Sequence, residues 1–129
     1  MKMYIASSYS RKTEAQDLER RFSLYGVESV SGWLHRPGGY PNTLEDDARQ
    51  DLTDIAKADV LLCITGDTET HGGRHTEIGI ALALHKEVFI KGPHEQIFHH
   101  LCKDWKVLCE RIGFSLDSCV PSKTAIESF

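Results

Sequence analysis

Two acidic residues lie beside apolar segments, where an unpaired carboxylate would be costly. Glu77 belongs to the segment 71–92, "HGGRHTEIGIALALHKEVFIKG", and stands between a pair of glycines and a nearly uninterrupted apolar run. Asp51 lies at the edge of an apolar stripe with helical spacing, made of Leu44, Ala48, Leu52 and Ile55. A carboxylate that leans toward a core costs free energy unless something there uses it. The two acids are therefore candidates for a catalytic pair.

The position of Glu77 suggests a role for its carboxylate. A helix expected from about 75 to 85 would place Glu77 in its first turn, where free backbone N–H groups and the helix dipole favour an anion. We expect this setting to keep Glu77 ionised and able to act as a nucleophile or base. A structural reading of each acid alone is equally open, with Glu77 complementing the dipole and Asp51 bordering the stripe.

Strand-like and helix-like segments alternate along the chain. Apolar strand patterns cover 3–7, 27–32, 59–65 and 87–92, and helical spacing begins near Thr13, at a Thr43–Asp46 capping box and near 75. This alternation predicts a doubly wound α/β fold of the flavodoxin/Rossmann-like type, with a parallel sheet of about five strands and helices on both faces. With strand order 2-1-3-4-5, the loops after the first and third strands would face each other across the ligand-binding crevice.

Finer features follow from the same patterns. Asp47 and Asp54 are expected to point away from the core, and Gly79 to permit tight packing of a helix that is apolar on nearly all sides. Such a helix also favours association with another subunit. Beyond Pro93 the pattern suggests three more elements: a short helix at 95–101, a fifth strand at 104–109 and a terminal helix at 121–129.

The overall composition bounds the class of protein. With 129 residues, 40% of them apolar, and a net charge of −4, we expect one domain spanning 1–129 that binds a small molecule rather than polymeric nucleic acid or a membrane. No segment approaches the about 20 apolar residues of a membrane span, and the first apolar stretch is too short for a signal peptide, so a cytoplasmic protein is expected. The cysteines form no C-x-x-C pair and are expected to be reduced and structural: Cys63, Cys102, Cys109 and Cys119.

Three stretches of the sequence carry a family resemblance. The segments 48–64 ("ARQDLTDIAKADVLLCI"), 72–92 and 95–101 resemble the nucleoside 2-deoxyribosyltransferase family, including its relatives that hydrolyse deoxynucleoside 5'-monophosphates. The most specific parts are D-L-x-x-I-x-x-A-D from Asp51 and G-x-x-x-E-x-G-x-A-x-x-x-x-K around Glu77. The resemblance runs from the first strand to about Leu101 and implies the doubly wound fold.

The resemblance also implies a mechanism and its residues. Glu77 would attack the anomeric carbon of the deoxyribose, Asp51 would support proton transfer to the departing base, and Tyr4 would lie beside the nucleophile. Cleavage through an oxocarbenium-like transition state with retention suits two carboxyl groups. The deoxyribosyl group would pass to a second nucleobase or to water. The family implies no cofactor or metal, and assembly as a homodimer or larger homo-oligomer.

Several further residues are expected to bind the substrate. Gly72 and Gly73 would let the backbone approach the sugar closely, and Trp33 would stack on the nucleobase or pack structurally. At the position of His71, transferases that act on free nucleosides commonly carry an aspartate that holds the sugar 5'-hydroxyl. A phosphate would suit the basic and hydroxyl groups present here instead, which are Ser7, Ser8, Ser10, Arg11, His71 and Arg74. These groups make a nucleotide substrate plausible, although a plain polar turn explains them too.

Two other functions are considered for this region, a metal site and a nucleotide sensor. A metal site at His71 and His75 is disfavoured, because the glycines between them interrupt a helix and no third ligand has metal-like spacing. His99 and His100 are expected at the surface or at an interface. A non-catalytic module that senses nucleotides in the same crevice would bind ligand without turnover.

Overall fold

The chain forms a five-stranded parallel sheet with helices on both faces. The structure is a computed structural model that describes residues 1–37, 43–67 and 72–115. The parallel sheet and its doubly wound architecture are as predicted, and the strand order is β2-β1-β3-β4-β5, the order assumed above for the crevice. The strands are β1 (Lys2–Ala6), β2 (Glu28–Ser29), β3 (Val60–Ile64), β4 (Glu87–Lys91) and β5 (Lys103–Asp104).

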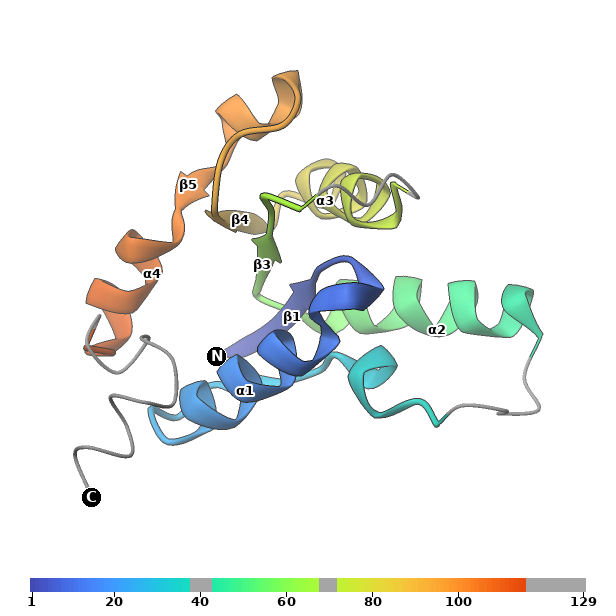
Figure 1. The fold of residues 1–129 in the computed structure, drawn as a ribbon, viewed down its shortest axis with the longest axis horizontal. Coiled ribbons are helices and arrows are strands. Elements are labelled where there is room, and N and C mark those ends of the chain that lie inside the picture. Colours follow the sequence, from blue (N-terminus) through green and yellow to red (C-terminus); the bar gives the residue numbers. More distant parts are fainter. Residues whose placement is uncertain (38–42, 68–71, 116–129) are drawn as a thin grey trace.

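The helices divide into two pairs that cover opposite faces of the sheet (Figure 1). The α-helices are α1 (Lys12–Ser23), α2 (Leu44–Lys57), α3 (Gly73–Ala83) and α4 (Trp105–Ile112), and the short 3-10 helices are η1 (Tyr9–Arg11), η2 (Gly32–His35) and η3 (Ile97–Leu101). Met3 and Ile5 of β1 pack into the core under α1 and α4, and Tyr4 and Ala6 pack into the core under α2 and α3. This alternation of side chains along β1 brings Tyr4 to the α2–α3 face.

The helix α2 begins where the sequence predicts and packs differently from expectation. The Thr43 hydroxyl accepts a hydrogen bond from the Asp46 N–H at 3.1 Å, and the Asp46 carboxylate accepts one from the Thr43 N–H at 3.3 Å, which completes the capping box. The expected apolar stripe is wrong at Leu44 and Leu52, which are exposed. The amino-terminal half of α2 projects past the sheet, so helical spacing there buries nothing (Figure 1).

Asp54 carries a buried carboxylate on α2. The sequence-based expectation that Asp54 points outward is wrong, since the residue is 5% exposed. Its carboxylate accepts hydrogen bonds from the Gly32 N–H at 3.2 Å and the Gln50 side chain at 2.8 Å. Asp54 thus ties α2 to η2, the turn that carries Trp33 and leads into Arg36.

The carboxyl-terminal elements correct the expected fifth strand. Residues 104–109 were expected to be extended, but α4 begins at Trp105, because the Asp104 carboxylate caps the helix by accepting from the Lys106 N–H at 2.8 Å. Trp105, Leu108, Cys109 and Ile112 face the core at helical spacing, and β5 is the two-residue strand before them. The expected short helix at 95–101 is present as η3, whereas the expected terminal helix at 121–129 lies outside the described residues.

Two other expectations concern single residues. A Cβ added at Gly79 would meet no atom within 4 Å, so this glycine is not needed for tight packing within the chain. Cys63, Cys102 and Cys109 are free thiols, and Cys119 lies outside the described residues. Within 1–37, 43–67 and 72–115, none of the helices has the length and hydropathy of a membrane span.

Candidate functional site

A cavity of about 210 Å³ opens at the carboxyl ends of β1 and β3, between η1, η2, α2 and α3. Among the described residues, ten line it, and the sequence had singled out eight of these as site residues: Ser7, Ser8, Trp33, Asp51, Gly72, Gly73, Arg74 and Glu77. The other two, Tyr9 and Arg36, were not anticipated. Ser10 and Arg11 contact residues at its edge, whereas His71 lies outside the described residues.

Tyr4 and Glu77 form the hydrogen bond that joins the sheet to α3 at this cavity. The Tyr4 hydroxyl donates to the Glu77 Oε2, and the Tyr4 side chain is fully buried. Burial and the adjacent charge of Glu77 raise the pKa of Tyr4 far above its ordinary value. The phenol therefore stays protonated and acts as a fixed donor toward the carboxylate.

Glu77 does not have the electrostatic setting that the sequence suggested. Because Gly72 adopts a left-handed conformation (φ 77°) and caps α3, the helix begins at Gly73 and Glu77 lies beyond its first turn. The expectation that the helix start keeps this side chain ionised is therefore wrong. Burial and the negative charge of Asp51 raise the pKa of Glu77 to about 7, while the Tyr4 hydrogen bond and the charge of Arg36 oppose that rise. Near neutral pH, Glu77 is divided between its acid and carboxylate forms.

Asp51 is held by an arginine from the opposite wall. The Arg36 Nη2 donates to the Asp51 Oδ1 at 3.0 Å, and the Arg36 Nε lies 3.3 Å from the Asp47 Oδ1. Burial raises the pKa of Asp51, the Arg36 contact lowers it, and the charges of Asp54 and Asp47 raise it, with a net upward shift. Arg36 was missed because its segment, "HRPGG", reads only as a loop.

Trp33 has the packing role that was left open for it, and its side chain also reaches the cavity. Its indole N–H donates to the Ile5 carbonyl at 2.8 Å, and the ring packs against both apolar cores. The same side chain lines the cavity. A ring anchored in this way offers a rigid aromatic surface at which a flat ligand can stack.

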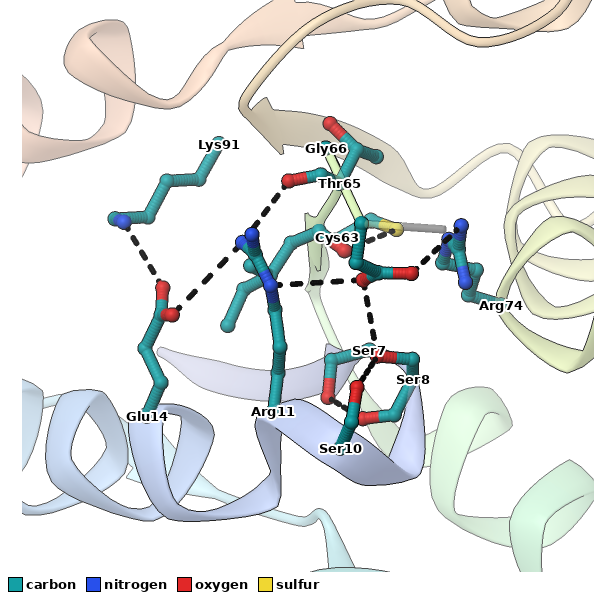
Figure 2. A network of polar contacts seen from close by, with 12 residues as sticks. Ser7, Ser8, Ser10, Arg11, Glu14, Cys63, Thr65, Gly66, Arg74 and Lys91 are labelled. Carbon is teal, nitrogen blue, oxygen red and sulfur yellow. Dashed lines mark hydrogen bonds and ion pairs between the residues drawn. The ribbon is translucent and has the colours of Figure 1, made fainter. Parts of the chain in front are cut away.

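Three of the groups expected to receive a phosphate, Ser8, Arg11 and Arg74, already contact one internal carboxylate (Figure 2). Asp67, which follows β3, accepts a hydrogen bond from the Ser8 hydroxyl at 2.9 Å and lies 3.5 Å from Arg11 and 3.4 Å from Arg74. The Ser8 hydroxyl also lies 2.9 Å from that of Ser10, and the Ser7 hydroxyl donates to the Ser8 carbonyl at 2.9 Å. Asp67 was not anticipated from the sequence.

Four histidines, His75, His94, His99 and His100, lie close to one another and next to this network. His99 is fully buried, which corrects the expected surface position, and its Nδ1 accepts from the Glu95 N–H at 2.9 Å. The His75 ring lies 5.3 Å from the His99 ring, and His100 is exposed. Among the described residues, no group of three potential ligands is arranged to hold a metal ion.

A second hollow of about 550 Å³ lies along the short strand β2, and the candidate acids do not line it. Its lining mixes acids and bases, and one pair, His35 and Glu19, is in contact at 2.6 Å. The smaller cavity is the better candidate because Asp51, Glu77, an aromatic face and the backbone of Gly72 and Gly73 converge there.

The raised pKa of Glu77 predicts how its replacement changes stability with pH. Between about pH 4.5 and 7 the folded state holds a proton that the unfolded state has released, so Glu77 lowers stability as the pH rises through this window. The difference in free energy of unfolding, Glu77→Gln minus parent, should therefore be roughly 1–3 kcal/mol larger at pH 8 than at pH 4. Urea unfolding at both values measures this, with Glu110→Gln on the exposed side of α4 as the control. An equal difference at both pH values would contradict it.

Comparisons with solved structures agree with the sequence resemblance. The chain is similar to a 2-deoxyribosyltransferase from Bacillus psychrosaccharolyticus (TM-score 0.63, 21% identity, covering 84% of this chain and 90% of that one). It is also similar to the CMP N-glycosidase BcmB of Clostridium botulinum (0.55, 20%, 70% and 70%) and to a conserved protein from Enterococcus faecalis V583 (0.56, 16%, 86% and 74%). No family model and no curated protein sequence matches the chain. At these identities the likeness establishes the shared fold, and two of the three neighbours are enzymes by name.

Proposed function

We propose that the protein cleaves the N-glycosidic bond of 2'-deoxynucleosides or their 5'-monophosphates and passes the deoxyribosyl group to another nucleobase or to water. One observation carries this proposal: Glu77, hydrogen-bonded to Tyr4, shares a cavity with Asp51 and Trp33. The sequence resemblance supports it, as does the fold shared with a 2-deoxyribosyltransferase and a CMP N-glycosidase.

The first half of the reaction uses Glu77 as nucleophile. Its carboxylate oxygen forms a bond to C1' of the sugar while the C1'–N bond breaks and the electron pair goes to the departing base. The Tyr4 hydroxyl holds the attacking carboxylate, and Asp51, with its raised pKa, supplies the proton that the base takes up. Gly72 and Gly73 give the sugar room close to the backbone, and Trp33 stacks on the base.

The second half reverses these bonds. A nitrogen of a second base, or a water molecule, attacks C1' and releases the Glu77 carboxylate, and the proton of the incoming nucleophile returns to Asp51. A second base makes the protein a transferase and water makes it a hydrolase. Incubation with each deoxynucleoside and monophosphate, with and without a second base, separates the two activities.

A non-catalytic nucleotide sensor is the alternative that the same cavity permits. The converging acids favour the enzyme, because a binding site alone has no use for two partly buried carboxyl groups whose pKa values are raised. Ligand binding without release of base from any deoxynucleoside or monophosphate would support the sensor.

The enzyme proposal predicts the effect of removing the nucleophile. Glu77→Ala should lower the rate of base release by at least about a thousandfold, because it removes the proposed nucleophile. Among the described side chains, Glu77 is the one that hydrogen-bonds to the Tyr4 hydroxyl. Chromatography of the free base measures the rate, and the melting temperature shows that the variant is folded. Glu110→Gln, which changes the net charge by one unit on an exposed part of α4, is the control. Undiminished release by Glu77→Ala would remove Glu77 from the mechanism.

We also propose that copies of the chain associate through the outer face of α2 and α3. Leu52 and Leu84 are 48% and 47% exposed, and Ile80 and Leu82 are only partly buried. Covering such side chains on association is favourable. Light scattering at micromolar concentration should give the mass of a dimer or larger assembly, and Leu84→Glu should lower it. A monomer mass for the parent protein would contradict the proposal.

A further inference from the structure

The carboxylate of Asp67 occupies an anion-binding site built from two arginines and a serine. It lies 3.5 Å from the Arg11 Nε and 3.4 Å from the Arg74 Nη2, and it accepts the Ser8 hydroxyl at 2.9 Å. Guanidinium groups and hydroxyls arranged around one anion are the donors that also bind a phosphate. Only 13% of the Asp67 side chain and 4% of the Arg74 side chain are exposed, so the cluster is largely withdrawn from water.

The cluster is adjacent to the substrate cavity and not separate from it. Ser8 and Arg74 both line the cavity that holds Glu77, and both contact Asp67. Figure 2 shows Arg11 and the serines approaching from the segment after β1, and Arg74 approaching from α3. A phosphate that reached this end of the cavity would therefore meet donors that already bind a carboxylate.

Oppositely charged side chains surround Asp67. Among the described residues, three cations, Arg11, Arg74 and Lys91, contact three carboxylates, Glu14, Asp67 and Glu95, at distances from 3.0 to 3.8 Å. Glu95 is fixed in turn by the Gly66 N–H at 3.2 Å. A phosphate monoester carries about −1.5 to −2 charges at pH 7, so its entry would add negative charge beside the largely buried Asp67–Arg74 pair.

We propose that Asp67 is a specificity-determining residue that occupies the place of a 5'-phosphate and restricts the protein to deoxynucleosides with an uncharged 5' end. This inference rests on the proposed function and narrows it. It favours the uncharged deoxynucleoside over the nucleotide that the sequence left open, because Ser8, Arg11 and Arg74, which had suggested a phosphate, have an internal partner. An uncharged hydroxyl at this end adds no negative charge and can donate to the carboxylate.

Substrate preference and phosphate binding test this inference separately. The parent protein should release base faster from the four common deoxynucleosides than from their 5'-monophosphates. Asp67→Asn keeps the shape and removes the charge, so it should raise the ratio of monophosphate to deoxynucleoside turnover by about tenfold or more. Titration with inorganic phosphate and with deoxyribose 5-phosphate, followed by ³¹P NMR, should show binding to Asp67→Asn at least about tenfold tighter than to the parent.

Two further variants control the experiment. Asp17→Asn removes a carboxylate that likewise pairs with two arginines, Arg20 and Arg21, but on the surface of α1, and should leave the ratio and phosphate binding as in the parent. Arg11→Gln added to Asp67→Asn should abolish the gained phosphate affinity. If Asp67→Asn does not fold, Asp67→Ser takes its place.

The outcomes separate this inference from the proposed function. Parent protein that prefers monophosphates, or binds phosphate as tightly as Asp67→Asn does, would overturn the role of Asp67 while leaving glycosidic cleavage intact. Failure of every substrate to release base would overturn the proposed function, and the phosphate titrations would still decide whether Asp67 fills an anion site.

Discussion

The hydrogen bond from Tyr4 to Glu77 is the interaction on which the candidate site depends. It joins the inner strand β1 to α3. These two elements are far apart in sequence and meet because β3, which leads into α3, pairs with β1. The phenol is buried in the α2–α3 core, so its position is set by packing and not by the cavity. A carboxylate that is hydrogen-bonded to such a rigid donor is restricted in the directions it can face.

The acids of this site are tuned by opposing effects. Burial raises the pKa values of both Glu77 and Asp51, and nearby carboxylates add to the rise, Asp51 acting on Glu77 and Asp54 and Asp47 acting on Asp51. Contacts with Tyr4 and Arg36 counter that rise. The result at Glu77 is a pKa of about 7, which leaves this carboxyl group only partly ionised at neutral pH. Arg36 is central to this balance, because one guanidinium lies between Asp47 and Asp51 and also acts on Glu77. In the second polar cluster, next to the cavity, the Asp67 carboxylate contacts two arginines, Arg11 and Arg74.

Much of the fold could be predicted from the sequence, because its signals are local. Apolar runs identified the long strands β1, β3 and β4, and the Thr43 capping box marked the start of α2. Features that depend on distant contacts could not be read in this way. Periodicity along α2 does not say which half reaches the sheet, so Asp54 was wrongly placed outside. Because Gly72 is left-handed, α3 begins earlier than expected and Glu77 lies beyond its first turn. Arg36 and Asp67 could not be identified from the sequence, because the residues that they contact are distant along the chain.

Mass spectrometry of the protein quenched in acid during turnover of a deoxynucleoside tests the central claim most directly. The proposed mechanism predicts a deoxyribosyl adduct on the peptide that contains Glu77, and its disappearance once a second base or water has completed the reaction. Matched samples of Glu77→Gln should show no adduct. Two results would contradict the assignment of Glu77 as the nucleophile. One is turnover at the normal rate without any adduct under conditions where the second step is slow. The other is an adduct on another residue.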